Sequence, residues 1–285
     1  MTERDRPALF TLRLPPSPWA RKAIGAAAVV AVVLVWAAIT FGKTPETRLV
    51  SPVVLPSPAE VVGSVKSLVT ERALFQSIAA TLWRVVLGFG LAVAIGVPLG
   101  IMAGSWRVLA GAQLSSSGPV IDAAAAPLAL FGRNIPIAAL IPLTILWFGI
   151  GESQKVMFIF LATLPFVFSD TVTAIAGVAD RYVDTAQTLG ARAWQVVRKV
   201  LVPLAMPDVY NSLRNLFGLA FGYIMLAELI NAKYGLGYLL STSQRRGMTE
   251  HIILILVVIG LLAYGIDRLL FWFQKGLFPY RKQDG

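Results

Sequence analysis

The chain has 285 residues, of which 56% are hydrophobic and only 14% are charged, and its mean hydropathy is +0.72. This composition excludes an ordinary soluble domain and indicates a multi-pass membrane protein. The absence of cysteine excludes disulfides, thiolate metal sites and thiol catalysis.

The formal net charge is +10, and the basic residues cluster in short segments that flank apolar runs. Positive-inside topology and anionic headgroups produce this distribution, so we expect membrane lipids rather than nucleic acid as the partner of these charges. The single histidine, His251, cannot build a histidine metal cluster and is expected to be an interfacial side chain.

The amino-terminal part is expected to form a tail, a span and a loop. Residues 1–21 contain four prolines and mixed charge, which is typical of a cytoplasmic tail. Residues 22–42 are expected to be the first transmembrane helix, because their apolar run is longer than a signal-peptide core and no small-residue cleavage site follows. Residues 43–77 are Pro-rich and then amphipathic, which predicts an external loop and an amphipathic helix.

Residues 78–275 are expected to form the core domain, followed by a cytoplasmic carboxyl-terminal tail at 276–285. With residues 22–42 the predicted spans number six, and the later five cover about 78–104, a stretch within 107–151, 155–177, 209–231 and 251–273.

The stretch 107–151 is the hardest to interpret, because Pro127, Pro136 and Pro142 interrupt it. Each proline removes a backbone donor and clashes one turn back, so we expect a kinked approach followed by one span. Counting 107–131 as a further span would make seven spans. The polar segment at residues 184–203 would then lie on the side of the membrane opposite the basic tail.

The segment "DTAQTLGARAWQVVRKVLVP", residues 184–203, is polar where a spanning segment would be apolar. Its spacing predicts an amphipathic helical hairpin in which a first short helix stops at Gly190 and the next span starts at Pro203. Such a hairpin suits docking to a soluble partner. The apolar stripe would contain Leu189, Trp194, Val197, Val200 and Leu201, and the polar stripe Arg192, Gln195, Arg198 and Lys199.

The same segment resembles the cytoplasmic loop of bacterial ABC importer permeases, in which an EAA triplet is followed by glycine and then by Ile-x-Leu-Pro. Other matching segments are "LGFGLAVAIGVPLGIMAG" (87–104), "PLTILWFGIGES" (142–153) and "AELINAKYGLGYLL" (227–240), which are similar to the nitrate, sulfonate and taurine branch. The departures are Asp for Glu, Thr for Ala, and Val for both Ile and Leu. The residues on the loop motif are Asp184, Thr185, Ala186, Gly190, Ala191, Val200, Val202 and Pro203.

This resemblance implies an all-α polytopic membrane protein of the MetI-like permease fold, with about six transmembrane helices and cytoplasmic coupling helices. It implies that a coupling loop at 180–206 rests on one of two ATP-binding cassette subunits, which bind ATP and Mg, so that this chain carries no cofactor. It also implies a second permease copy and an external solute-binding protein that delivers a small anion such as nitrate, a sulfonate or taurine. The expected location is the bacterial cytoplasmic (inner) membrane, with both termini in the cytoplasm.

Absent motifs narrow the function further. The sequence has no G-x-x-x-x-G-K-[ST] phosphate loop and no Ser/His/Asp or paired-carboxylate arrangement, so the chain is expected not to be an enzyme. The alternative is a secondary transporter driven by an ion gradient, which would predict inverted repeats and acidic residues at the midplane.

Charges and glycines inside the spans are further candidates. Glu228, Arg84 and Arg214 are the candidate residues of the translocation pathway, and Glu228 is expected either to line it or to pair with a basic group such as Arg84. Arg214 and Asp170 are expected near the cytoplasmic interface. Asp267 and Arg268 are expected to pair locally. Small-residue spacing predicts helix packing, within the chain or at a subunit interface, at Gly96, Gly100, Gly104, Gly218 and Gly222.

Overall fold

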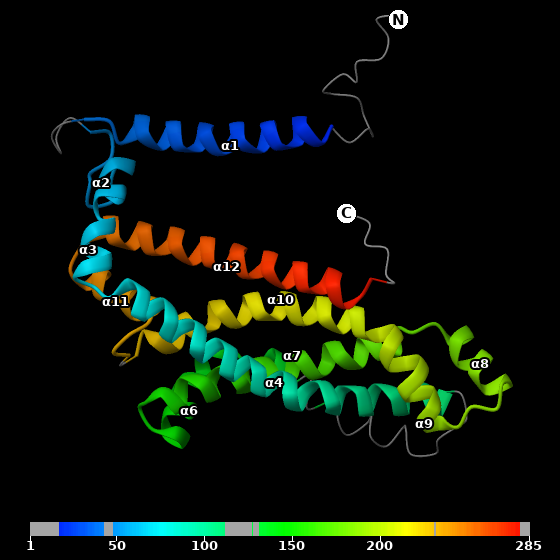
Figure 1. The fold of residues 1–285 in the computed structure, drawn as a ribbon. Coiled ribbons are helices and arrows are strands. Elements are labelled where there is room, and N and C mark those ends of the chain that lie inside the picture. The colour runs from blue at the N-terminus through cyan, green and yellow to red at the C-terminus, as the bar shows by residue number, and fades with distance from the viewer. Residues whose placement is uncertain (1–16, 43–47, 112–126, 128–130, 231, 280–285) are drawn as a thin grey trace, which may run out of the picture. The chain divides into compact units, whose positions relative to one another are not determined.

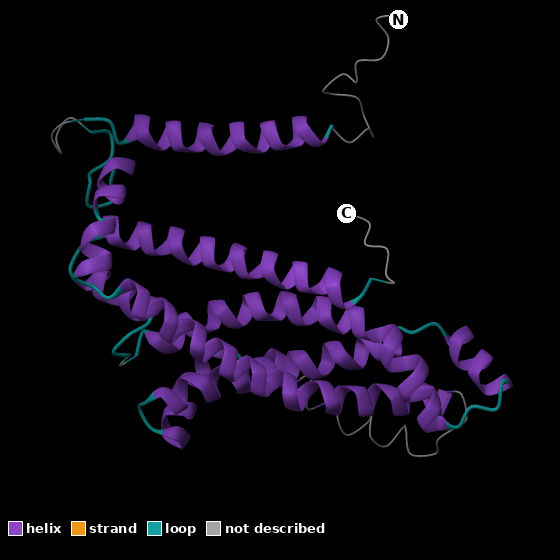
Figure 2. Ribbon diagram, viewed as in Figure 1, coloured by secondary structure: helices purple, strands orange, loops and turns teal. Residues whose placement is uncertain are grey.

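A computed structural model describes residues 17–42, 48–111, 127, 131–230 and 232–279. These residues form helices joined by loops, and no strand occurs among them (Figures 1 and 2). The α-helices are α1 (Pro18–Ile39), α2 (Pro58–Gly63), α3 (Val65–Thr70), α4 (Leu74–Gly111), α6 (Leu140–Phe148), α7 (Glu152–Ala176), α8 (Asp180–Thr188), α9 (Ala193–Val196), α10 (Val202–Glu228), α11 (Leu236–Arg245) and α12 (Thr249–Leu277). A 3-10 turn (Ile137–Ala139) precedes α6, and a π-helical turn (Val197–Leu201) joins α9 to α10.

The chain divides into two compact units, of which the larger comprises residues 68–242 and 255–285. Its centre is the packing of α4 against α7, with α10 against both (Figure 1). Buried apolar side chains from all three helices fill this centre, among them Val85, Phe158 and Ile224.

Glycines on α4 allow α4 and α7 to approach closely. A Cβ added at Gly100 would lie 2.6 Å from Thr171 Cβ, and one at Gly96 would lie 2.9 Å from Val167 Cγ1. The glycine spacing on α4 therefore serves packing within this chain. Gly218 and Gly222 on α10 differ, because an added Cβ at either position meets nothing within 4 Å.

Four described helices are long and apolar enough to cross a membrane, namely α1, α4, α7 and α12. Helix α10 has 27 residues, about 40 Å at 1.5 Å per residue, but is more polar. For the span expected within 107–151, the longest described helical stretch that follows α4 in this range is Ile137–Phe148, and residues 131–134 form one further helical turn. Twelve helical residues extend about 18 Å, which is less than a bilayer core of about 30 Å. Pro142 lies in the first turn of α6. Backbone N–H groups in the first turn of a helix have no acceptor within that helix, so the proline breaks no hydrogen bond of α6.

The smaller unit comprises residues 1–67 and 243–254, and here the predicted amphipathic helix is two short helices, α2 and α3. A capping box starts α2, because the Ser57 side chain accepts from the Glu60 N–H while the Glu60 carboxylate accepts from the Ser57 N–H. Arg48 donates to both oxygens of Glu60, at 2.9 and 3.1 Å. These contacts hold the pKa of Glu60 at about 2, chiefly because Arg48 stabilises its charged form. His251 is buried, and its Nε2 lies 2.8 Å from Ser67 Oγ.

Candidate functional site

The hairpin between α7 and α10 begins with α8, which ends in a Schellman motif. The Gly190 N–H donates to the Gln187 carbonyl at 2.8 Å, and the Ala191 N–H donates to the Ala186 carbonyl at 3.0 Å. Gly190 has φ +76°, a conformation that glycine adopts without a Cβ penalty. The predicted end of the first short helix at Gly190 is thus confirmed, and the positive φ of this glycine explains why the helix ends there.

The second arm of the hairpin is continuous with the following long helix. Helix α9, the π turn and α10 follow one another without a break from Ala193 to Glu228. Helix α10 begins at Val202, so the predicted start of the next long helix at Pro203 is confirmed to within one residue. No break separates this helix from the hairpin. The wider π turn provides room for the proline ring, which would clash with a carbonyl one α-turn back.

A buried apolar cluster fixes the hairpin to the ends of the long helices. It joins the hairpin to α4, α7 and α10, and consists of Leu109, Ile175, Val178, Val183, Val196, Leu201 and Ala205. Ala186, Ala191, Val200 and Val202 pack against this cluster. Four of the motif residues therefore help to hold the hairpin on the helical core.

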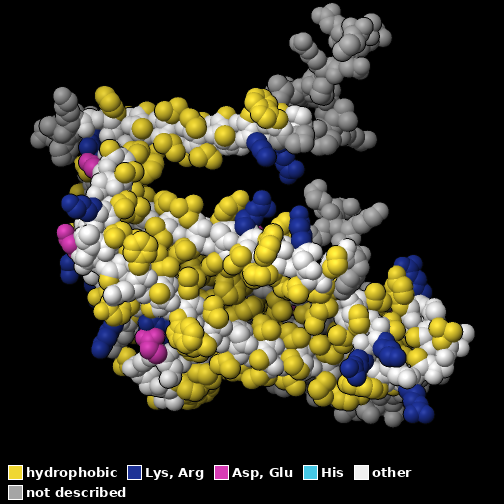
Figure 3. All heavy atoms as spheres, in the orientation of Figure 1, with side chains coloured by type: hydrophobic (Ala, Val, Ile, Leu, Met, Phe, Trp, Pro, Cys, Tyr) yellow, Lys and Arg dark blue, Asp and Glu magenta, His cyan; other side chains and the backbone are white. Residues whose placement is uncertain are grey.

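The outer surface of the hairpin is exposed and partly apolar. Of the predicted apolar stripe, Leu189 is 82% exposed and Trp194 is 68% exposed, whereas Leu201 is buried. Asp184, Thr185, Gly190 and Pro203 are exposed as well. Basic side chains gather at the α8–α9 end of the molecule (Figure 3), where Arg192, Arg198 and Lys199 are exposed. Exposed large apolar groups with a charged rim are typical of a docking surface.

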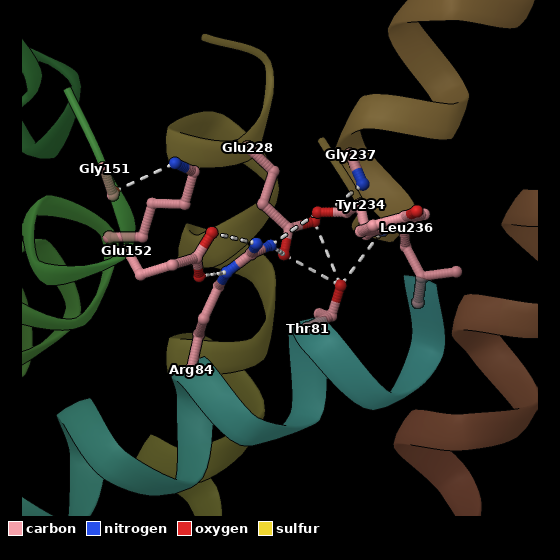
Figure 4. Close-up of polar contacts among 9 residues, drawn as sticks. Thr81, Arg84, Gly151, Glu152, Glu228, Tyr234, Leu236 and Gly237 are labelled. Carbon is pink, nitrogen blue, oxygen red and sulfur yellow. Dashed lines mark hydrogen bonds and ion pairs between the residues drawn. The ribbon is translucent and has the colours of Figure 1, made fainter. Parts of the chain in front are cut away.

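A second polar group is buried within the larger unit and centres on Arg84 of α4 (Figure 4). The Arg84 guanidinium donates to both carboxylate oxygens of Glu152, at 2.6 and 2.7 Å. It also donates to Glu228 Oε1 at 2.7 Å and to the Tyr234 carbonyl at 2.8 Å. Of the two alternatives for Glu228, pairing with Arg84 is therefore present, and a role in lining the pathway stays a prediction for both residues.

Glu228 is 0% exposed, and several donors converge on its carboxylate. Besides Arg84, Thr81 Oγ1 donates to it at 2.8 Å and the Gly237 N–H donates at 2.9 Å. A Cβ at Gly235 would lie 2.5 Å from the Glu228 carboxyl carbon, so this glycine gives the carboxylate its space. The "GLG" of residues 235–237, at the start of α11, thus lies against the Glu228 side chain.

Sequence reasoning missed Glu152, Lys155 and Thr81 in this group. Lys155 is 1% exposed and donates to the Gly151 carbonyl at 3.0 Å. Glu152, Lys155 and Glu228 are charged residues in apolar stretches of a chain that has few internal charges. Their presence there is the signal that could have indicated this group.

The remaining intramembrane charges also have partners. Arg214 of α10 pairs doubly with Asp267 of α12, with Nη2 at 2.8 Å from Oδ2. The predicted local pair between Asp267 and Arg268 is therefore wrong, and the Arg268 guanidinium lies 5.9 Å from the Phe271 ring centroid. Asp170 pairs with Arg133 at 3.3 Å.

Long apolar helices, a buried ion pair and an exposed hairpin continuous with a long helix define a polytopic membrane protein. Residues 96–280 match the family model described as "Binding-protein-dependent transport system inner membrane component". The chain belongs to this family. It is the permease subunit of an ABC importer and a multi-pass inner-membrane protein.

The relatives agree with this assignment. The chain is 30% identical over 238 residues to the taurine transport system permease protein TauC of Escherichia coli (strain K12), covering 82% of each chain. It is also 30% identical to the putative aliphatic sulfonates transport permease protein SsuC of Bacillus subtilis (strain 168), covering 82% of this chain and 80% of the relative. These matches give no support to the ion-gradient alternative.

Two solved structures show the same fold at low identity. An inward-facing structure of the MetNI methionine ABC transporter has TM-score 0.61 at 22% identity and covers 71% of this chain and 95% of that chain. An amino acid ABC transporter with histidines has TM-score 0.58 at 22% identity, with coverage of 73% and 96%. The expected MetI-like permease fold is confirmed.

Proposed function

We propose that this chain, paired with a second copy, forms the translocation pathway for a small anionic solute such as a sulfonate, taurine or nitrate. An external solute-binding protein delivers the solute, and two ATP-binding cassette subunits bind ATP and Mg and hydrolyse the nucleotide. The names of the relatives support the substrate class. In this arrangement both termini and the hairpin at 180–206 are cytoplasmic, and residues 43–77 are external.

The observation that carries the proposal is the exposed hairpin joined to α10 by unbroken helix. Leu189 and Trp194 enter a groove of the ATPase subunit, with Asp184, Thr185 and Gly190 on the same outer surface. Ala186, Ala191 and Val200 hold the hairpin on the core. Since a short helix continuous with a long one does not absorb displacement, closure of the two ATPase subunits moves α10.

This movement converts ATPase closure into alternating access. ATP binding draws the two hairpins together and turns the cavity outward, and hydrolysis returns it inward. Arg84, Glu228 and Arg214 lie beside the pathway in this proposal, where the buried Arg84–Glu228 pair and the more exposed Arg214–Asp267 pair fix the helices that line it.

Copurification of the ATPase subunit with this chain tests the proposal. Trp194→Ala is expected to lose most of the bound ATPase, because it removes the largest exposed apolar group of the hairpin. Trp272→Ala is the matched control, since Trp272 on α12 is also 68% exposed. Normal retention of the ATPase by Trp194→Ala, with nucleotide hydrolysis still stimulated by loaded binding protein, would contradict the docking surface.

A further inference from the structure

Helices α10 and α12 lie side by side and are joined by polar contacts on the half of α10 that is nearer the hairpin (Figure 1). Arg214 pairs with Asp267, and the Tyr210 hydroxyl donates to the Leu270 carbonyl at 2.9 Å. A cavity of about 180 Å³ lies between the two helices and has Arg214 and Asp267 in its lining. Its other lining side chains are mostly apolar and include Phe217, Phe221, Ala263, Ile266 and Leu270.

The size and lining of this cavity limit what it can hold. Sites for small molecules usually enclose about 300–1,000 Å³. A segment of a single acyl chain needs less room and only an apolar lining. The cavity therefore suits hydrocarbon, with one charged pair beside it.

Three cations gather around the ring of Phe271 on α12. The Lys275 ammonium lies 4.7 Å from the ring centroid. The guanidinium carbons of Arg214 and Arg268 lie 4.9 and 5.9 Å from it. No two of the three lie further apart than 10.8 Å, the sum of the two longest distances. Among the described residues Asp267 is the one carboxylate that pairs with any of them, so this cation group carries a net charge of +2.

Apolar and aromatic side chains surround the cation group on α12. Trp272 is 68% exposed and Phe273 is 45% exposed, and the neighbouring Leu269 and Leu277 are exposed as well. Exposed aliphatic groups suit lipid, and tryptophan is enriched where a membrane meets water. The cation group is therefore placed at the level of lipid headgroups.

Gln274 adds a hydrogen-bond acceptor on the same face of α12. It follows Phe271 by three residues and Asp267 by seven, which is the spacing of one helical stripe. Gln274 is 6% exposed, and its Oε1 has no hydrogen-bond partner among the described residues. A buried acceptor is costly unless a donor reaches it. A ligand with a hydroxyl beside its negative charge would satisfy both Gln274 and the cation group.

We propose that the cation group, Gln274 and the cavity form a binding site for phosphatidylglycerol. The phosphate accepts from Arg268 and Lys275, and a hydroxyl of the headgroup donates to Gln274. Along α12 the cavity continues from these residues toward Ala263, and along α10 toward Phe221, so a segment of acyl chain extends from the headgroup toward the membrane centre. Basic residues at a membrane surface attract anionic lipids in this way. Only the leaflet rests on the proposed function, which makes the hairpin end of α10 cytoplasmic.

Lipid binding by the purified complete transporter in detergent, measured by native mass spectrometry, tests the site. The probes are dioleoyl phosphatidylglycerol and dioleoyl phosphatidylcholine, of which the first is expected to bind at least tenfold more tightly. Arg268→Gln and Lys275→Gln are each expected to weaken phosphatidylglycerol binding about fivefold, because each removes one attracting charge. Arg181→Gln is the matched control, since Arg181 is exposed on α8 outside the cation group and its loss is expected to leave this binding unchanged.

Phe271→Leu separates the arrangement of the cations from their number. It keeps every charge but removes the ring that attracts the three cations, so binding of phosphatidylglycerol is expected to fall severalfold. Glycerol 1-phosphate, which has the headgroup without acyl chains, is expected not to displace the lipid at equal concentration. Equal binding of the two lipids, an equal loss in Arg181→Gln, unchanged binding in Phe271→Leu, or displacement by glycerol 1-phosphate would overturn the lipid site.

ATP-driven solute uptake by the same transporter in vesicles keeps this inference separate from the proposed function. Uptake that needs ATP in a transporter without preference for phosphatidylglycerol overturns the lipid site and leaves the proposed function standing. A preference that depends on Arg268 and Lys275, in a transporter whose uptake needs no ATP, supports the lipid site and refutes the proposed function.

Discussion

Arg84 binds two carboxylates that differ sharply in burial. This difference predicts that Arg84→Met and Glu152→Gln reduce the free energy of unfolding by very different amounts. The Glu228 side chain is 0% exposed, whereas the Glu152 side chain is 66% exposed. Arg84→Met would leave the Glu228 carboxylate buried without a cation, and breaking a buried pair in this way costs about 3–5 kcal/mol. Glu152→Gln would remove only a solvent-screened partner, which costs about 0.2–1 kcal/mol.

The assay is thermal unfolding of the purified transporter in detergent, followed for each variant against the natural chain. Arg84→Met is expected to lower the midpoint much more than Glu152→Gln. The double variant Arg84→Met with Glu228→Gln is expected to recover part of the loss, because a neutral amide is easier to bury than a carboxylate and can still accept from Thr81 and Gly237. Equal unfolding midpoints for Arg84→Met and Glu152→Gln would refute the argument that the buried Glu228 carboxylate requires the positive charge of Arg84.

Three further predictions concern backbone, packing and pH. Gly190→Ala is expected to cost about 1–2 kcal/mol at the end of α8, because φ is +76° there, and to reduce solute-stimulated ATPase activity; unchanged activity would argue against a strict turn. Gly100→Ala is expected to destabilise the transporter, whereas Gly90→Ala on the same helix is not, because an added Cβ meets a neighbour at 2.6 Å at Gly100 and nothing within 4 Å at Gly90; equal unfolding midpoints would contradict the close packing. The pKa of Glu60 is about 2, below its unfolded value of about 4.3, so its stabilisation of α2 is complete above about pH 4.3 and is lost as pH falls through about 2. Because the Glu60 side chain is 40% exposed, the loss is about 1 kcal/mol or less, and hydrogen exchange of residues 57–63 should show it in the natural chain but not in Glu60→Gln.

The features that the sequence predicted well are those set by local pattern. Long apolar runs correspond to α1, α4, α7 and α12, and the turn at Gly190 follows from a glycine placed after an amphipathic segment. The Arg84–Glu228 pair could be anticipated because two opposite charges in apolar spans are expensive to leave apart.

Other features depend on information that local pattern lacks. Leu189 and Trp194 recur at helical spacing, but spacing does not distinguish a side chain buried in its own chain from one exposed to a partner. Asp267 and Arg268 are adjacent in sequence, yet neighbouring residues on a helix point about 100° apart, so a residue on the facing helix, Arg214, was better placed to pair. The unbroken helix from α9 into α10 depends on a π turn, which no local sequence pattern indicates.

The two ends of α10 have different attachments, and this determines how a push on the hairpin is transmitted. At one end, Glu228 is tied to α4 through Arg84 and Thr81; at the other, α10 continues into the hairpin. A rigid helix pivoting at Glu228 has its largest displacement at Trp194, and Asn211, halfway between them in sequence, moves about half as far. Nucleotide-dependent distances between spin labels on the two copies, at the exposed positions 198, 211 and 226 in turn, should therefore change in decreasing order. Equal changes at all three positions would mean that α10 translates as a whole, and would remove the pivot from the mechanism.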